Sequence, residues 1–457
     1  MTLNYLSHTL CSMLSQSTLA RWSENRYYEI NYSVNRDEDI VIRNVEFANG
    51  RTISSSLPIK KLGDSSLETF DISYLMCEEK PEVVEDGLEI RLCDLFSGCG
   101  GISVGIEEAA RSLGMRVKHV LAWDIMEEAR LTYAENFETQ FVRGDPIEQI
   151  IDGSLGEDLT SNEIEFLSGI GDIDFVVGGP PCQGHSDLNN HSRRDDPKND
   201  LYLRMTRFIE ITRPKIAIIE NVITVRRSKS KVTQKTHQFL QSLGYSVQQD
   251  VIRAIDLGVA QDRRRHFTIA VRDGPIPDGI FGAKRVSKPR PVLWALEELG
   301  AVDPNSVYNS PSTHQIQNKE RIRWLFGEDW TEEEKLDDEY NFGTYEKPFS
   351  YNLINPRRPK CHQNGHNYPA VYGRMFPDKP APTMTGGFGS TGQGRFVHPN
   401  HPRTLTPHEV CRVQSFPDYF KFPESIKRRA MHVMIGNSVP PAISEHVSRK
   451  LLSVLEA

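Results

Sequence analysis

The composition of this 457-residue chain excludes several classes of protein. With 38% hydrophobic residues it can bury a sizeable core in two or three domains, and no apolar run approaches the roughly 18 residues of a membrane span. The net charge of −8 argues mildly against a nucleic-acid ligand, but basic runs such as 261–265 and 284–290 gather in the second half.

The cysteines and the N-terminus give expectations about the compartment. Seven cysteines without a CxxC pair indicate neither a disulfide framework nor a zinc site, so we expect no metal. The start "MTLNYLSHTLCSML" lacks the basic start and long apolar core of a signal peptide. We therefore expect a cytoplasmic, nucleoid-associated protein that does not bind membranes.

Residues 1–88 are predicted to form an N-terminal extension whose role the residues do not reveal. Within it, "IVIRNVEFANGRTISSSL" predicts a β-hairpin that turns at Asn49-Gly50.

Residues 89–275 predict a catalytic and cofactor-binding domain of the α/β class. Five apolar runs alternate with helical patterns, and they read "EIRLCDLF", "VKHVLAWD", "IDFVVGG", "KIAIIEN" and "HFTIAV". This alternation predicts a doubly wound, mostly parallel, Rossmann-like sheet. Residues 275–400 are rich in Pro, Gly and Asn and have no sustained period, so we expect residues 276–430 to form a smaller irregular domain, before a C-terminal segment at 431–457 that returns to the catalytic domain.

The first predicted strand runs directly into the glycine-rich "SGCGG" and then into a helical pattern. Glycines there let backbone amides approach a ligand, and the next strand ends at Asp124, about where nucleotide-binding folds place an acid on ribose. The turn lacks the lysine of a phosphate-binding loop, so ATP hydrolysis is disfavoured.

Three other strand ends carry reactive or charged side chains. Cys182 follows a buried strand and two prolines that restrict the backbone. Most cysteines are small buried hydrophobic residues, but this position favours a thiol held in a fixed direction. Glu220 ends another apolar run, where it is either a functional acid or an ordinary solvated strand end. The arginines of 261–265 precede a strand, where they are either functional or part of a salt-bridge patch on the surface.

Taken together, these residues resemble the DNA (cytosine-5) methyltransferase family, in its prokaryotic modification-methylase form. Six motifs agree in order: "DLFSGCGG" (94–101), "GGPPCQGHS" (178–186), "ENV" (220–222), "QDRRR" (261–265), "RTLTPHEVCRVQSFPD" (403–418) and "GNSVPP" (436–441). The resemblance implies methyl transfer from S-adenosylmethionine to carbon 5 of cytosine, with S-adenosylhomocysteine as the second product and no metal.

The resemblance also implies roles for four catalytic residues. Cys182 would attack carbon 6, and Glu220 would bond to ring nitrogen 3. Arg265 would hold the cytosine carbonyl oxygen, while Arg263 would support the pocket or contact phosphate.

On the cofactor side, Phe96 is expected to pack on adenine, Asp124 to bind ribose and Asp145 to bind the adenine amino group. The remaining expected cofactor contacts are Ser97, Gly98 and Gly100 for the methionine part, Pro181 and Leu201 for the wall, and Asn437 and Val439 to close the pocket.

The implied substrate is a cytosine flipped out of a short, specific sequence of double-stranded DNA. The loop 184–197 is expected to close over the DNA, and residues from about 290 to 395 to read the bases. The chain departs from common family residues at His185, at Asp124, where glutamate is usual, and at Lys198.

The expected protein is a monomer, and analogy with the family suggests a restriction endonuclease acting on the same site as a further partner. A tRNA cytosine-5 methyltransferase and a catalytically silent DNA-binding regulator remain as alternatives. A cysteine hydrolase is a third, but it would need a histidine base beside Cys182.

Overall fold

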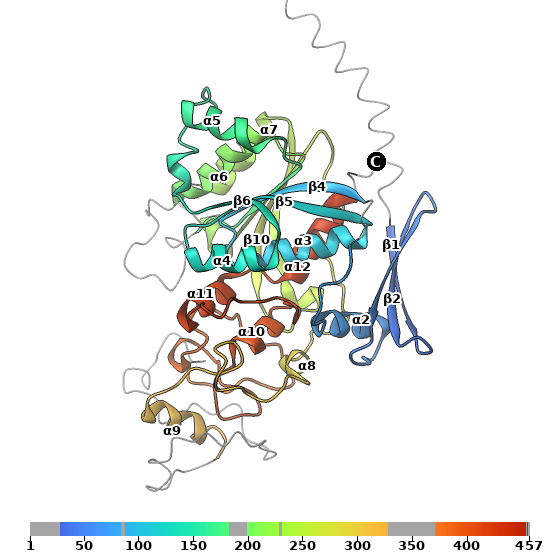
Figure 1. Ribbon diagram of the computed structural model, residues 1–457, viewed down its shortest axis with the longest axis vertical. Helices are drawn as coiled ribbons and strands as arrows, with labels where there is room; N and C mark the ends of the chain where they lie inside the picture. Colours follow the sequence, from blue (N-terminus) through green and yellow to red (C-terminus); the bar gives the residue numbers. More distant parts are fainter. Residues whose placement is uncertain are drawn as a thin grey trace, which may run out of the picture. The chain divides into compact units, whose positions relative to one another are not determined.

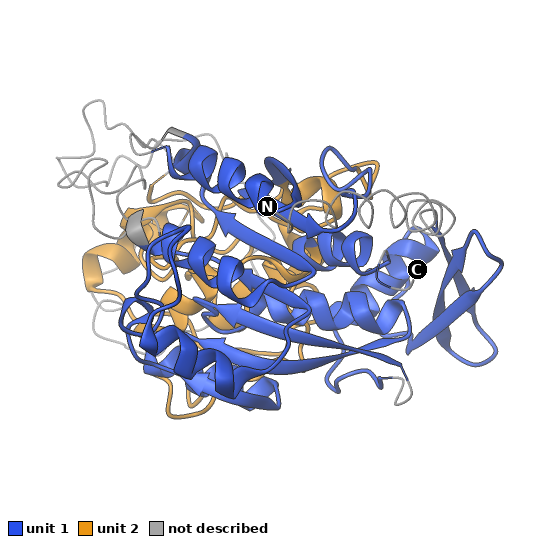
Figure 2. Cartoon of the chain, turned by 90° about the horizontal axis from the view of Figure 1, so that it is seen from above, with its two compact units in different colours: residues 1–252, 264–283, 443–457 blue, residues 253–263, 284–442 orange. Residues whose placement is uncertain are grey.

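The structure is a computed structural model that describes residues 28–83, 87–181, 199–227, 231–327, 371–453 and 455. The chain divides into two compact units (Figure 2). The first unit comprises residues 1–252, 264–283 and 443–457, and the second comprises residues 253–263 and 284–442. In the described part of the chain, no helix has the length and apolar character needed to span a membrane.

The first unit is built on a seven-stranded sheet in the order β6-β5-β4-β7-β8-β10-β9. Its strands are β4 (Leu88–Leu95), β5 (Met115–Trp123), β6 (Thr139–Arg143), β7 (Phe175–Gly178), β8 (Ile216–Asn221), β9 (Tyr245–Arg253) and β10 (Arg264–Arg272). The neighbours from β6 to β8 pair in parallel, whereas β10 runs antiparallel to β8. The predicted mostly parallel sheet is confirmed, with all five predicted strands.

Helices cover both faces of this sheet (Figure 1). One face carries α3 (Gly101–Ser112), α4 (Glu127–Asn136) and α12 (Pro441–Leu452), of which residues 443–452 belong to this unit. The other face carries α5 (Ser161–Ile170), α6 (Asn199–Thr212) and α7 (Val232–Ser242), and two short 3-10 helices follow β6 and β8, η1 (Ile147–Gln149) and η2 (Ile223–Arg227). All residues of β7 and β8 are buried, which explains their unbroken apolar runs.

The two edge strands, β6 and β9, were not predicted. Residues 140–142 of β6 are exposed, and β9 mixes polar with apolar residues. An edge strand is covered less than a central one, so it needs no continuous apolar run.

The N-terminal extension contributes a second, three-stranded antiparallel sheet to the first unit. Its elements are β1 (Tyr28–Asn35), β2 (Ile40–Phe47), β3 (Thr52–Pro58) and the helix α2 (Ser66–Leu75). The predicted hairpin is confirmed, because β2 and β3 pair from Glu46 with Thr52 across the Asn49-Gly50 turn. Helix α2 packs on this sheet, where Phe70 lies 5.2 Å from Tyr32 between ring centroids.

The described residues of the second unit lie mostly outside helices and strands. Its helices are η3 (Ala254–Leu257), α8 (Val292–Leu296), α9 (Ile316–Trp324), η5 (Thr391–Gln393), α10 (Pro407–Val413) and α11 (Arg428–Asn437). Helix α10 begins with a capping box, in which the Thr406 side chain accepts from the Glu409 amide and the Glu409 side chain accepts from the Thr406 amide.

Candidate active site

The turn between β4 and α3 holds three residues with positive φ, namely Phe96 (55°), Gly98 (54°) and Gly100 (92°). Phe96 has a side chain, so this conformation costs about 1–2 kcal/mol and is the kind of strain that gathers at functional sites. At Gly100 a Cβ atom would lie 2.4 Å from the ring of Phe137, whereas a Cβ atom at Gly98 would meet nothing within 4 Å. The turn therefore packs tightly at Gly100 and is open at Gly98.

Asp124, at the end of β5, is tied to this turn. Its carboxylate accepts hydrogen bonds from the amides of Gly98 (2.9 Å) and Met126 (2.8 Å). Burial raises the pKa of Asp124, and these two amide bonds oppose the rise. The next residue, Ile125, is 71% exposed, which the sequence does not reveal.

Asp145 is held by Arg143 at the end of β6. The guanidinium donates from Nε (3.0 Å) and from a terminal nitrogen (2.8 Å) to the two carboxylate oxygens. Trp123 donates its indole N–H to the Asp145 carbonyl oxygen at 2.7 Å. Partial burial works against ionisation, but the hydrogen bonds and charge of Arg143, together with a backbone hydrogen bond and the charge of Arg130, lower the pKa of Asp145. The side chain is thus an oriented, ionised acceptor, and Arg143 is a supporting residue that the sequence reasoning missed.

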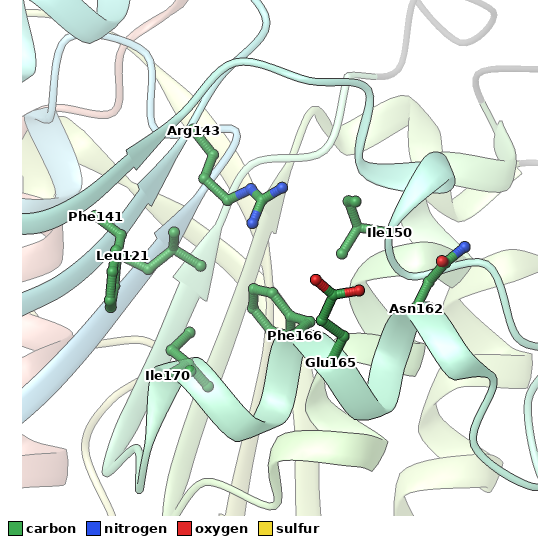
Figure 3. Close-up of a pocket in the computed structure, with 9 residues that line it drawn as sticks. Leu121, Phe141, Arg143, Ile150, Asn162, Glu165, Phe166 and Ile170 are labelled. Carbon is green, nitrogen blue, oxygen red and sulfur yellow. The ribbon is translucent and has the colours of Figure 1, made fainter.

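A groove of about 250 Å³ lies beside Arg143, bordered by β5, β6 and α5 (Figure 3). Its lining is mostly apolar, with Arg143, Asn162 and Glu165 as the polar exceptions among residues such as Phe141 and Phe166. None of the predicted cofactor residues lines this groove, but Arg143, which lines it, pairs with Asp145.

A buried chain of hydrogen bonds runs beneath the turn and was also missed from the sequence. Ser103 donates to Asp94 at 2.7 Å and lies 2.8 Å from the Tyr133 hydroxyl, which is 2.9 Å from His119 Nδ1. The other ring nitrogen of His119 is 3.2 Å from Glu107. Burial raises the pKa of Asp94 well above its usual range. Asp94, an acid at the end of the first predicted apolar strand, is the feature of the sequence that could have indicated this hydrogen-bond network.

Glu220 and Arg265 form an ion pair at the carboxyl end of β8. Arg265 Nε lies 2.8 Å from a Glu220 carboxylate oxygen, and the two side chains are 13% and 10% exposed. Burial lowers the pKa of the Arg265 guanidinium, and the charge and hydrogen bond of Glu220 oppose that change. The structure thus brings together two of the four predicted catalytic residues.

The segment that leads to Cys182 lies against the end of β8. Asn221 donates to the Pro180 carbonyl oxygen at 3.0 Å, and a Cβ atom at Gly179 would be 3.0 Å from a Glu220 oxygen. Pro181 is half-buried and is the last described residue before the gap. Cys182 and the predicted closing loop 184–197 lie outside the described residues.

Leu201 and Phe96, which both belong to the predicted cofactor set, pack against the same hydrophobic cluster of the first unit. Ser97 is half-buried, and its amide donates to the Trp123 carbonyl oxygen at 3.2 Å. The predicted residues that lie together in this unit are thus those of the turn, Asp124, Asp145, Pro181 and Leu201.

Arg263 belongs to the second unit and is fully buried. One of its terminal nitrogens donates to the Met384 carbonyl oxygen at 2.7 Å, and the other donates to the carbonyl oxygens of Gly436 (2.9 Å) and Ser438 (2.7 Å). Such a guanidinium supports the backbone around it instead of facing a phosphate. The neighbouring Gln261 accepts from the Met384 amide at 3.1 Å, which joins the same segments.

Asn437 and Val439 flank the Arg263 contact at Ser438. In the second unit Asn437 is exposed and Val439 is buried. Their part in closing the cofactor pocket of the first unit stays a prediction.

Gly100→Ala should destabilise the protein by roughly 2–5 kcal/mol, because the methyl group adds a positive-φ penalty to a clash with the Phe137 ring. Gly98→Ala is the matched control and should cost only about 1–2 kcal/mol, because its added methyl group meets no atom. Urea unfolding of the two variants would measure the difference. Equal losses would mean that the Gly100 contact does not restrict the turn.

Comparisons with known proteins agree with this arrangement. Residues 90–453 match the profile of the C-5 cytosine-specific DNA methylase family. The chain is 39% identical over 409 residues to the Type II methyltransferase M1.BsuMI of Bacillus subtilis, an alignment that covers 88% of this chain and 91% of that protein. It extends beyond the family match and so includes part of the segment before residue 90.

Two further proteins are similar over most of their length. The chain is 30% identical to the Type II methyltransferase M.XorII of Xanthomonas oryzae, over 79% of this chain and 84% of that protein. Among solved structures, an E. coli prophage protein described as a DNA modification methyltransferase is similar with a TM-score of 0.55 and 25% identity, over 80% of this chain and 100% of that one.

Proposed function

This chain belongs to the C-5 cytosine-specific DNA methylase family, and on that premise we propose that it methylates carbon 5 of a flipped cytosine in a short, specific sequence of duplex DNA. The methyl donor is S-adenosylmethionine, and S-adenosylhomocysteine is released. The observation that carries the proposal is the buried Glu220–Arg265 pair at the strand ends of the sheet that bears the glycine turn.

The residues of the first unit fit this cofactor. Asp145, ionised and oriented by Arg143, is suited to accept the adenine amino group, and the strained Phe96 offers a ring for the adenine face. Asp124 keeps acceptor capacity for ribose hydroxyls besides its two amide bonds. The open space at Gly98 leaves room for the methionine part along Ser97, Gly98 and Gly100. Bound there, the cofactor supplies an electrophilic methyl group.

Four further residues complete the proposed pocket. From the motifs of the sequence, Pro181 and Leu201 are proposed for its wall, and Asn437 and Val439 for its closure. Arg263 acts as a positioning residue, because it holds the backbone on both sides of Asn437.

The target carbon of cytosine is too poor in electrons to accept a methyl group unaided. The Cys182 thiolate adds to carbon 6, which pushes an electron pair towards carbon 5. After methylation a base removes the carbon-5 proton, and the bond between carbon 6 and sulfur breaks, which returns the thiolate.

Glu220 and Arg265 act on the same base from the strand ends. Glu220 takes up a proton from solvent as the base binds and donates it to ring nitrogen 3, which stabilises the electron-rich intermediate. Arg265 turns its donors to the carbonyl oxygen of the cytosine, and its ion pair fixes both side chains before the base arrives.

A base inside a duplex cannot reach such a site, so the target cytosine must be flipped out of the helix. Flipping costs a few kcal/mol, which contacts between the protein and the DNA offset. The loop 184–197 and the stretch 290–395 are the proposed sources of these contacts and of sequence specificity. In a restriction-modification role a cognate endonuclease would share the site, and we propose a monomeric enzyme in the bacterial cytoplasm.

Bisulfite sequencing of a plasmid from a methylation-free host expressing the wild-type protein tests the proposal. The expected result is protection of cytosines at one short recurring sequence, absent with empty vector. Protection nowhere, with folded protein present, would contradict DNA methylation. Transfer of label from S-adenosylmethionine to tRNA would then favour an RNA substrate, and transfer to neither would favour a silent regulator.

A further inference from the structure

The N-terminal sheet is joined to the proposed cofactor domain through a buried arginine. Arg43, in the middle strand β2, has no exposed surface, and its NH1 atom donates to Glu108 of α3 at 2.7 Å. The same atom lies 3.6 Å from Glu445 of α12, and the guanidinium carbon is 4.8 Å from the ring centroid of Phe70 on α2. One side chain therefore contacts residues of α2, α3 and α12, three helices that are far apart in sequence.

Arg43 belongs to a cluster of five charged residues, all buried except the partly buried Glu445, which we call the Arg43 cluster: Arg43, Glu108, Arg111, Glu445 and Arg449. Arg111 donates to both carboxylate oxygens of Glu108, at 2.7 and 2.8 Å, and Arg449 pairs with Glu445. Although burial opposes it, Arg111 and Arg43 lower the pKa of Glu108 to about 2, so Glu108 is ionised.

The cluster has three cations for two anions, so each glutamate keeps an arginine partner even without Arg43. In addition, the Nε and NH2 atoms of Arg43 are buried and find no hydrogen-bond partner among the described residues. Burying unsatisfied donors costs stability. A role other than stability therefore accounts better for this arginine.

Helices α3 and α12 meet at both ends of α3. Ser444 lies 3.4 Å from the carbonyl oxygen of Gly101, the first residue of α3, and Arg449 donates to Ser112, the last residue, at 3.0 Å. Gly101 directly follows Gly100 of the turn, so a shift of α12 along α3 reaches the turn.

A second connection leads from the N-terminal extension to the turn. Lys80, just after α2, pairs with Glu107 of α3 at 2.7 Å, and its ammonium lies 5.3 Å from the ring centroid of Phe137. Phe137 is the ring that closes on Gly100. The extension thus supports the turn from two directions.

We propose that the N-terminal sheet is a brace for the cofactor turn, in which Arg43 is a positioning residue that holds α3 and α12 together. The proposal rests on the proposed function of the turn. It gives the extension a role in cofactor affinity, which the brace raises by ordering the turn before the cofactor binds.

Arg43→Met in the full-length protein tests the brace, with two readouts. The affinity for S-adenosylhomocysteine, measured by calorimetry, should fall about tenfold or more. Without any ligand, the amide protons of Gly98 and Val104, which donate to Asp124 and Gly100 in the structure, should exchange with solvent about tenfold faster.

Arg207→Lys is the matched control for lost stability. Arg207 forms an equally buried pair with Glu163, at 2.7 Å, between α6 and α5 on the other face of the sheet. The control should lower the melting temperature without changing either readout. Glu445→Gln is a second test variant, since it weakens the contact of Arg43 with α12 and leaves the Glu108 pairs in place.

Unchanged affinity and unchanged exchange in both folded test variants would overturn the brace, even with a lower melting temperature. Failure of Arg43→Met to fold leaves the decision to Glu445→Gln. Failure of the wild-type protein to bind S-adenosylhomocysteine would contradict the proposed function, while the exchange readout would still decide whether the sheet orders the turn.

Discussion

Cys182→Ser should lower methyl transfer by at least about a thousandfold while leaving cofactor and DNA binding intact. A serine hydroxyl has nearly the shape of the thiol, but it ionises far less readily, so it cannot supply the nucleophile that carbon 6 requires. Transfer of labelled methyl groups to DNA measures the first effect, and gel-shift titration measures the second.

Cys77→Ser is the matched control, because the thiol of Cys77 donates to the Glu79 carbonyl oxygen and a hydroxyl can do the same. Its turnover should equal that of the wild type. Methylation by Cys182→Ser at a rate near the wild-type rate would remove Cys182 from the mechanism.

Glu220→Gln should slow turnover by about 10²–10⁴-fold, the range for loss of a group that moves a proton in the transition state. A glutamine amide can donate a hydrogen bond to ring nitrogen 3 but cannot transfer a proton to it, so the electron-rich ring is stabilised less. The loss should therefore appear in kcat more than in the KM for DNA, which steady-state kinetics at saturating cofactor would separate.

The sheet offers a control carboxylate at its opposite end. Asp174 precedes β7 and pairs with Arg91 at 2.9 Å and with Lys215 at 3.0 Å. Asp174→Asn should cost stability but leave kcat unchanged. A kcat loss of similar size in both variants would attribute the Glu220 effect to a weakened sheet and not to chemistry.

The central elements of the fold could be predicted because their signals are local. Each buried strand must be apolar along its length, as β7 and β8 are, and a turn with positive φ favours glycine wherever it occurs. The edge strands β6 and β9 and the first strand of the N-terminal sheet lack a continuous apolar run, because one side or one face of each is less covered.

The residues of the candidate site could be identified from the motifs, but the contacts that distinguish one residue from another could not. Arg263 and Arg265 are two positions apart and chemically identical, yet one is bonded to backbone carbonyl oxygens and the other to Glu220. The partners of Arg263 lie more than a hundred residues away along the chain. The residues next to Arg263 in the sequence therefore do not indicate which groups it will contact.

The amino-acid sequence alone was enough for the family, the α/β class and the order of the reactive residues, because apolar runs, glycine turns and motif spacing are properties of short stretches. Folding settled what depends on long-range contact. The contacts formed on folding are the pair of Arg143 with Asp145, the buried chain of hydrogen bonds from Asp94 to Glu107, and the pairs of Arg43 with Glu108 and Glu445. Side chains meet their partners only after distant elements pack, so these contacts depend on the whole chain and not on any one segment.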